Sequence, residues 1–228
     1  MNLLWLAVAA VGCIVEAVFI IEEHRGKMLT AVIVKTVASL LFVLLGVLCA
    51  AGAADGAYAG VILAGLVFGA IGDVCLNLRH LAGERGKGVF MAGIAAFLIG
   101  HLFYLFALIR RAPQMLLWAA PACAVISALL LWFILKRIEV QGALKSFGIL
   151  YLVVVFFMAS CALGLLVVDA GDPGHWIFAL GAVLFAASDV LLVLNQFGRK
   201  RYPAFRAMNL SLYYAGQICI ALTIALMR

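Results

Sequence analysis

Two aspartates lie inside long apolar stretches of this chain. Residues 65–78 read GLVFGAIGDVCLNL and contain Asp73, and residues 181–194 read GAVLFAASDVLLVL and contain Asp189. Aligned without gaps, the two stretches share seven of fourteen residues, and the aspartates coincide. A charged side chain at the middle of a bilayer costs about 2.5–3.5 kcal/mol on insertion scales, so one that is kept there faces a cavity or a partner. Paired carboxylates in such a place favour acid/base chemistry, because burial can leave one protonated and the other charged.

Other polar side chains also lie within apolar stretches, at depths that place them in one layer with the two acids. Asn77 follows Asp73 by four residues and therefore shares its helix face, and Ser188 directly precedes Asp189. Together these side chains predict a polar pocket within the membrane. Besides the two acids, its expected members are Lys35, Asn77, His101, Tyr104, Tyr151, Ser188, Tyr214 and Gln217.

These polar residues also have a purely structural interpretation. A Ser, Tyr or Asn inside a membrane often hydrogen-bonds neighbouring helices. Lys35 could form an ion pair with Glu16 or Asp73 that only stabilises the fold. Two acids at equivalent positions of similar stretches fit this interpretation poorly, so a functional role for Asp73 and Asp189 is favoured.

The sequence argues against metal and nucleophile chemistry. A hydrolytic metal site needs at least three His, Cys or carboxylate ligands, and His101 is the one histidine of four that falls inside an expected span. The six cysteines are scattered singly and predict neither a disulfide framework nor a metal site. Ser188 lacks the GxSxG context of a serine nucleophile. We therefore expect no metal and no cofactor.

Composition predicts an all-α, polytopic membrane protein. Of the 228 residues, 68% are hydrophobic and 11% are charged, whereas soluble domains are near half apolar and a quarter charged. Eight apolar segments are long enough to cross the hydrocarbon as helices. They lie at about 1–21, 28–50, 58–78, 89–109, 115–135, 147–168, 176–196 and 208–227. They leave no room for a soluble domain, so residues 1–228 form one membrane domain.

The distribution of basic residues predicts the orientation. Twelve Lys and Arg residues lie in the first, third, fifth and seventh connections, and three lie on the other side. The positive-inside rule then places both termini outside the cytoplasm and the polar pocket toward the cytoplasmic leaflet, in the plasma (inner) membrane. The same rule accounts for the net charge of +6, so nucleic acid is not an expected partner.

The two similar stretches also predict an internal repeat. Asp73 and Asp189 are 116 residues apart, and the same offset carries Gly100-His101 onto Gly216-Gln217. We expect two four-helix halves, residues 1–112 and 113–228. Since each half holds an even number of spans, the halves run parallel about an axis along the membrane normal.

Several short motifs together resemble the lysoplasmalogenase family of YhhN-like membrane proteins. They are GD at 72–73, HLFY at 101–104, Tyr151, SD at 188–189 and YYAGQ at 213–217. The family tends to have Lys-Pro in its second span, whereas here Thr36 follows Lys35. The resemblance implies a hydrolase that cleaves the vinyl ether bond of lysoplasmalogens to a fatty aldehyde and glycerophosphoethanolamine or glycerophosphocholine. A lysophospholipid in a lipid bilayer is then the expected partner.

The chemistry of vinyl ether hydrolysis suggests roles for the pocket residues. Asp73 and Asp189 would be the catalytic acid and carboxylate, in either order, as two carboxylates act on glycosidic bonds. Lys35 would hold one of them ionised, and the other pocket side chains would orient water or substrate. Weaker head-group contacts are expected from the loop cations, although the positive-inside rule also explains these. They are Arg79, Arg199 and Lys200.

Two other functions fit the same residues. Parallel repeats and intramembrane acids also occur in transporters, where the acids relay protons. A membrane scaffold could use the acids only to pair with Lys35. Formation of a lipid product, flux of a solute across liposomes, or neither would separate the three alternatives.

Overall fold

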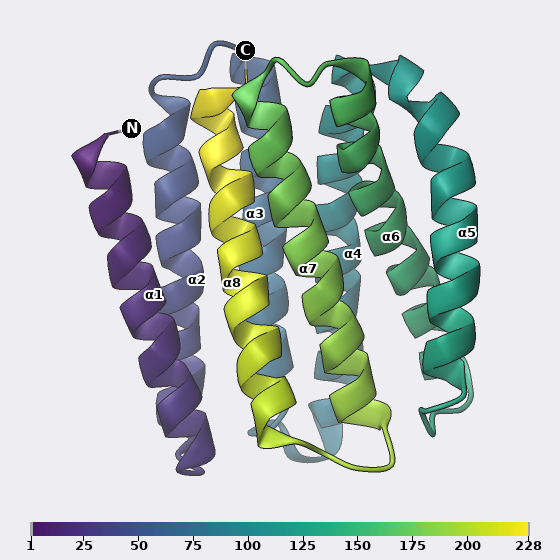
Figure 1. Ribbon diagram of the computed structural model, residues 1–228. Coiled ribbons are helices and arrows are strands. Elements are labelled where there is room, and N and C mark those ends of the chain that lie inside the picture. The colour runs from purple at the N-terminus through teal and green to yellow at the C-terminus, as the bar shows by residue number, and fades with distance from the viewer. Residues whose placement is uncertain (1, 228) are drawn as a thin grey trace.

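The computed structural model describes residues 2–227, and this part of the chain forms eight long helices joined by short connections (Figure 1). All eight are long and apolar enough to cross a membrane, which confirms the predicted all-helical, multi-pass bundle. They are α1 (Leu3–His24), α2 (Met28–Ala50), α3 (Gly56–Leu78), α4 (Gly86–Arg111), α5 (Leu116–Leu135), α6 (Ala143–Val168), α7 (Pro173–Phe197) and α8 (Pro203–Leu226).

The helices begin and end within a few residues of the predicted spans, and several extend further. Pro203 starts α8 and Pro173 starts α7, because proline suits the first turn of a helix, where its missing N–H is not needed. The expectation that His175 lies in a connection was wrong. Asp172 caps α7 by accepting a hydrogen bond from the Gly174 N–H, so His175 already belongs to its first turn and is buried.

The eight helices lie side by side in one bundle (Figure 1). The most extensive packing joins α7 to α8 and α3 to α4, while α1 packs on α2 and α5 on α6. In addition α8 contacts α2, and α4 contacts α6, so residues from both halves of the chain meet at the centre. The start of α1 and the end of α8 lie at the same end of the bundle (Figure 1), as an even number of spans requires.

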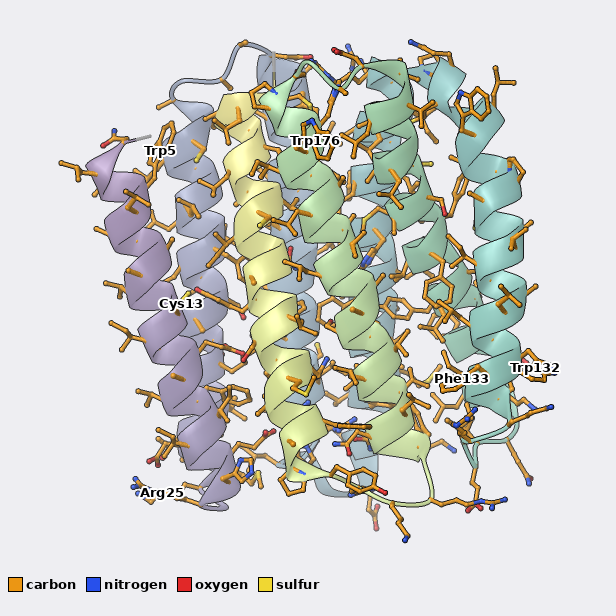
Figure 2. The ribbon with its side chains drawn as sticks, in the orientation of Figure 1. Trp5, Cys13, Arg25, Trp132, Phe133 and Trp176 are labelled. Atoms are coloured by element: carbon orange, nitrogen blue, oxygen red, sulfur yellow. The ribbon has the colours of Figure 1, made fainter. Side chains whose placement is uncertain are left out.

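The outer surface is apolar, as contact with lipid requires. On α5 the side chains of Leu117, Val125, Leu129 and Trp132 are each about 60% exposed or more, and Figure 2 shows Trp132 pointing away from the bundle. An exposed apolar surface this continuous marks contact with a membrane or a partner. The exposed side of α5 therefore fits the hydrocarbon.

Two glycine contacts bring the most tightly packed helices together. A Cβ atom added to Gly100 on α4 would lie 3.0 Å from the carbonyl oxygen of Gly65 on α3. One added to Gly216 on α8 would lie 2.9 Å from the carbonyl oxygen of Gly181 on α7. Small residues allow such close approach of membrane helices. The second pair lies 116 residues after the first, the offset that the repeat predicts, and the repeat itself stays a prediction.

Substituting either glycine should destabilise the protein. We expect Gly100→Val and Gly216→Val each to lower the free energy of unfolding by about 1–3 kcal/mol, the usual effect of overpacking, because the new side chain meets backbone atoms. Thermal unfolding in detergent measures the effect. Gly60→Val is the control, since open space surrounds a Cβ atom at that position. Equal melting temperatures for all three variants would contradict the close packing.

Candidate active site

One cavity is lined by both aspartates. Its empty volume is about 1150 Å³, which includes the open space at its mouth. Asp73 from α3 and Asp189 from α7 both line it, together with residues of α2, α4, α5, α6 and α8. The cavity reaches the end of the bundle where α3 and α7 end, since Arg79 and Phe197 also line it. Ligand sites are usually single concave pockets with a few convergent polar groups, and this cavity has that character.

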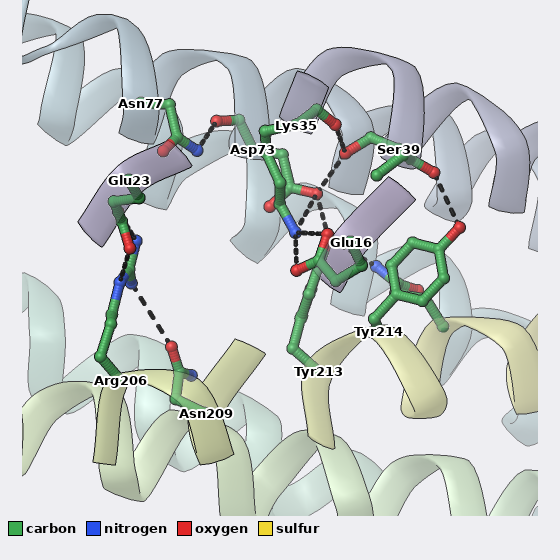
Figure 3. A network of polar contacts seen from close by, with 12 residues as sticks. Glu16, Glu23, Lys35, Ser39, Asp73, Asn77, Arg206, Asn209, Tyr213 and Tyr214 are labelled. Atoms are coloured by element: carbon green, nitrogen blue, oxygen red, sulfur yellow. Dashed lines mark hydrogen bonds and ion pairs between the residues drawn. The ribbon is translucent and has the colours of Figure 1, made fainter. Parts of the chain in front are cut away.

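Asp73 is held by side chains from two other helices. The Ser39 hydroxyl on α2 donates a hydrogen bond to its Oδ2 atom at 2.5 Å. The Tyr213 hydroxyl on α8 donates to the same oxygen at 2.8 Å. The ammonium of Lys35 lies 3.7 Å from that oxygen (Figure 3). A buried carboxylate with a cation and two hydroxyl donors is well stabilised in its ionised form.

Lys35 lies between Asp73 and a second carboxylate, that of Glu16 on α1. Its Nζ atom donates to the two carboxylate oxygens of Glu16 at 2.8 and 3.0 Å. The side chains of Lys35 and Glu16 are only 1% and 3% exposed. The ring of Tyr213 lies 4.7 Å from the same ammonium. The ion pairs that the sequence suggested, with Glu16 and with Asp73, are therefore both present (Figure 3).

Asp189 has a different environment. The Tyr151 hydroxyl on α6 donates to its Oδ2 atom at 2.6 Å. Over residues 2–227, no Lys, Arg or His nitrogen forms an ion pair with Asp189. One acid thus has a cation and two hydroxyl donors, and the other has one phenol and no cation. Two carboxyl groups in unequal environments are the arrangement that separates an acid from a base.

Three further predicted residues form hydrogen bonds that position Asp73 or Tyr213. Asn77 lines the cavity and donates its amide to the backbone carbonyl of Asp73 at 2.9 Å. Tyr104 donates to Gln217 at 3.0 Å, and the Gln217 amide donates to the Tyr213 hydroxyl at 3.2 Å. Tyr104 and Gln217 do not line the cavity. They orient Tyr213, which in turn contacts Asp73.

The remaining predicted pocket residues are buried away from the cavity wall. The Nδ1 atom of His101 lies 2.7 Å from the backbone carbonyl of Phe97, and its ring packs edge-on against Phe185. The Ser188 carbonyl accepts a hydrogen bond from Asn209 at 2.8 Å. Tyr214 donates to the backbone carbonyl of Ala38 at 3.0 Å. Among the described residues, no three His, Cys, Asp or Glu side chains are grouped closely enough to hold a metal ion.

The loop cations separate into two groups. Arg79 lines the cavity mouth, whereas Arg199 and Lys200 do not. Arg199 instead donates to Glu139 at 3.1 Å in an exposed pair. Sequence reasoning missed other side chains that belong to the cavity or to Asp73. They are Ser39, Lys145, Gln196, Arg206 and Asn209. Tyr213, which belongs to the YYAGQ motif, was interpreted as a structural contact between helices, yet it donates to Asp73.

Spacing could have revealed part of that group. Ser39 follows Lys35 by four residues, and Tyr213 precedes Gln217 by four, so each shares a helix face with a residue that was predicted. For Arg206 and Lys145 the sequence holds no comparable signal, because their role depends on how α8 and α6 are rotated against the cavity.

The fold and this centre define a multi-pass membrane protein with a buried, two-carboxylate site open to one end of the bundle. The chain belongs to the YhhN family, which matches residues 30–224. That match begins after α1, so the helix that carries Glu16 lies outside it.

Named relatives share about 30% identity. The chain is 29% identical over 174 residues to lysoplasmalogenase TMEM86B of Sus scrofa, covering 75% of this chain and 66% of the relative. It is 32% identical over 164 residues to lysoplasmalogenase TMEM86A of Bos taurus, covering 71% and 64%. With TMEM86B of Rattus norvegicus it shares 29% over 224 residues, covering 96% and 83%. The chain thus spans about two thirds of the length of the first two relatives. No solved structure matches it.

The Glu16–Lys35 contact yields a stability prediction. We expect Glu16→Gln to lower the free energy of unfolding by about 3–5 kcal/mol, because it leaves a buried ammonium with weaker compensation. Adding Lys35→Met together with Asp73→Asn removes that ammonium without leaving the Asp73 carboxylate buried and uncompensated, so the triple variant should be more stable than Glu16→Gln alone. Unfolding of the purified protein, followed by tryptophan fluorescence, measures both. A triple variant less stable than Glu16→Gln would show that these ion pairs do not explain the burial of the three residues.

Proposed function

We propose that this chain is a membrane-embedded lysoplasmalogenase, which hydrolyses the vinyl ether bond of lysoplasmalogens to a fatty aldehyde and glycerophosphoethanolamine or glycerophosphocholine. The observation that carries the proposal is the cavity shared by Asp73 and Asp189, whose partners differ. The names of the relatives give the same reaction for those proteins. No cofactor is needed for this chemistry.

The walls of the cavity suit an amphiphile with one tail. One wall is polar and carries Lys35, Asp73 and Tyr213. The facing wall comes from α5, α6 and the connection between them. It is lined by Leu131, Ile134, Leu135, Ile138, Val140, Leu144 and Leu152. An alkenyl chain placed along this second wall would bring its first double bond toward the acids.

Hydrolysis then needs one proton donor and one proton acceptor. A carboxylic acid gives its proton to the β-carbon of the vinyl ether, which leaves an oxocarbenium ion at the carbon attached to oxygen. A carboxylate stabilises that cation and takes a proton from the water that adds to it. The first carboxyl group, now ionised, takes the hydroxyl proton of the resulting hemiacetal. The bond to the glycerol oxygen breaks, and the second carboxyl group returns its proton to that oxygen. One water is consumed, and both carboxyl groups return to their starting states.

The two environments suggest which aspartate acts as the carboxylate and which as the proton donor. Asp73, beside Lys35 and two hydroxyl donors, is built to act as the carboxylate that stabilises the cation. Asp189, with Tyr151 as its partner and no cation in contact, is the better proton donor. Tyr151 would orient the Asp189 carboxyl group toward the cavity.

Replacing either acid should abolish turnover. We expect Asp73→Asn and Asp189→Asn each to lower kcat for lysoplasmenyl-ethanolamine by about 10²–10⁴-fold, the usual contribution of general acid/base catalysis. Release of aldehyde from the purified protein measures it. Glu84→Gln is the control, since Glu84 is an exposed acid in the turn before α4. Wild-type turnover in both Asn variants, with the fold intact, would refute the proposed roles.

A further inference from the structure

Three cations from three different elements line the mouth of the cavity. Arg79 directly follows α3, Lys145 lies in the first turn of α6, and Arg206 lies in the first turn of α8. The positive-inside rule explains why cations are common at one end of a bundle. It does not explain why these three face the cavity while Lys136 and Arg137, at the same end, lie over rings of the preceding helix, α5.

Arg206 and Arg79 differ in how their charge is compensated. Arg206 donates to both carboxylate oxygens of Glu23, at 2.6 and 2.9 Å (Figure 3). Arg79 has neutral partners, donating to Gln196 at 3.1 Å and to His80 at 3.3 Å. Over the described residues no carboxylate lies within ion-pair distance of Arg79. A guanidinium has five N–H donors, so Arg79 keeps charge and donors for a ligand.

Although no carboxylate pairs with Arg79, a ring contact fixes the position of its side chain. Its guanidinium lies 4.4 Å from the ring centre of Phe90, which also lines the cavity. Burial, with a smaller effect of Arg206, lowers the pKa of Arg79 to about 10, so the side chain stays charged at neutral pH. Lys145, on another wall, likewise has no carboxylate of the described chain within ion-pair distance. The mouth therefore presents two cations that lack a counter-ion.

The spacing of Arg79 and Asp73 along the chain is compatible with the length of a lysophospholipid head. Arg79 follows Asp73 by six residues, which is about 9 Å along a helix. The glycerol backbone of a lysoplasmalogen separates its phosphate from its vinyl ether by a comparable length. A phosphate at the mouth would thus leave the vinyl ether near Asp73 and the tail near the apolar wall.

We propose that Arg79 and Lys145 bind the phosphate of the lysophospholipid, with Gln196 positioning the Arg79 guanidinium. This inference rests on the proposed function for the identity of the lipid. Arginine binds phosphate through two parallel N–H donors, and Lys145 adds a point charge from the opposite wall. The head group is then recognised through its phosphate, which the ethanolamine and choline lipids share. Arg199 and Lys200 lie outside the cavity and take no part.

Binding of lipids that the enzyme cannot cleave tests the site separately from the reaction. The probes are a saturated 1-alkyl-glycerophosphoethanolamine, the matching 1-alkylglycerol without phosphate, and inorganic phosphate as a competitor. The full chain in lipid nanodiscs should bind the phosphorylated lipid at least tenfold more tightly than the alkylglycerol. Arg79→Gln and Lys145→Gln should each weaken that binding about tenfold, as expected for charged hydrogen bonds, and leave alkylglycerol binding unchanged. Arg137→Gln is the matched control and should bind like the wild type.

Three results would overturn the proposal that this site binds the phosphate of the lipid. They are equal binding of the two lipids by the wild type, wild-type affinity in both Arg79→Gln and Lys145→Gln, and displacement of the lipid by millimolar inorganic phosphate, which would assign the site to a soluble anion. Since Lys145 is exposed, its variant keeps the test valid if Arg79→Gln fails to fold. Aldehyde release separates the two proposals: phosphate-dependent binding without turnover supports the site and refutes the reaction, and turnover with unchanged binding in the variants does the reverse.

Discussion

The placement of one ammonium group inside the membrane determines much of this structure. Lys35 on α2 lies between Glu16 on α1 and Asp73 on α3, at 2.8 and 3.7 Å. Lipid offers no solvation to a charge, so the three side chains stay buried only while they remain together. Ser39 and Tyr213 complete the coordination of Asp73. The interaction therefore connects four helices and holds Asp73 at the cavity wall.

The second acid depends on the other half of the bundle. Asp189 on α7 is held by Tyr151 of α6 and has no cation in the described chain beside it. The close packing of α3 on α4 and of α7 on α8 brings the two acids to one cavity, whose far wall is apolar. The proposed hydrolysis of a single-chain vinyl ether lipid would use Asp189 as the neutral acid, Asp73 as the carboxylate and this apolar wall for the tail. The cations at the mouth would, in the proposed site, bind its phosphate.

The helices and the ion pairs of Lys35 were predictable from the sequence, because lipid strongly constrains both backbone hydrogen bonding and buried charge. Eight apolar segments gave eight helices, and a lysine among acids predicted its ion pairs. The faces that helices turn toward the cavity were harder to predict, since rotation depends on packing between distant segments. Tyr214 was expected in the pocket, yet its neighbour Tyr213 is the one that contacts Asp73. Likewise the loop conformation placed Arg199 on Glu139 and outside the cavity.

Proton delivery to carbon by a fixed carboxyl group is the central claim, and turnover in D₂O tests it most directly. The aldehyde would be reduced as it forms, and the configuration at the carbon next to its carbonyl would be determined. In the proposed reaction a carboxyl group of the cavity that Asp73 and Asp189 line delivers the proton to a bound substrate, so we predict a single deuterium on one face of that carbon. A racemic label would mean that a free enol leaves the site and takes its proton from bulk water. That result would contradict catalysis by the acid pair.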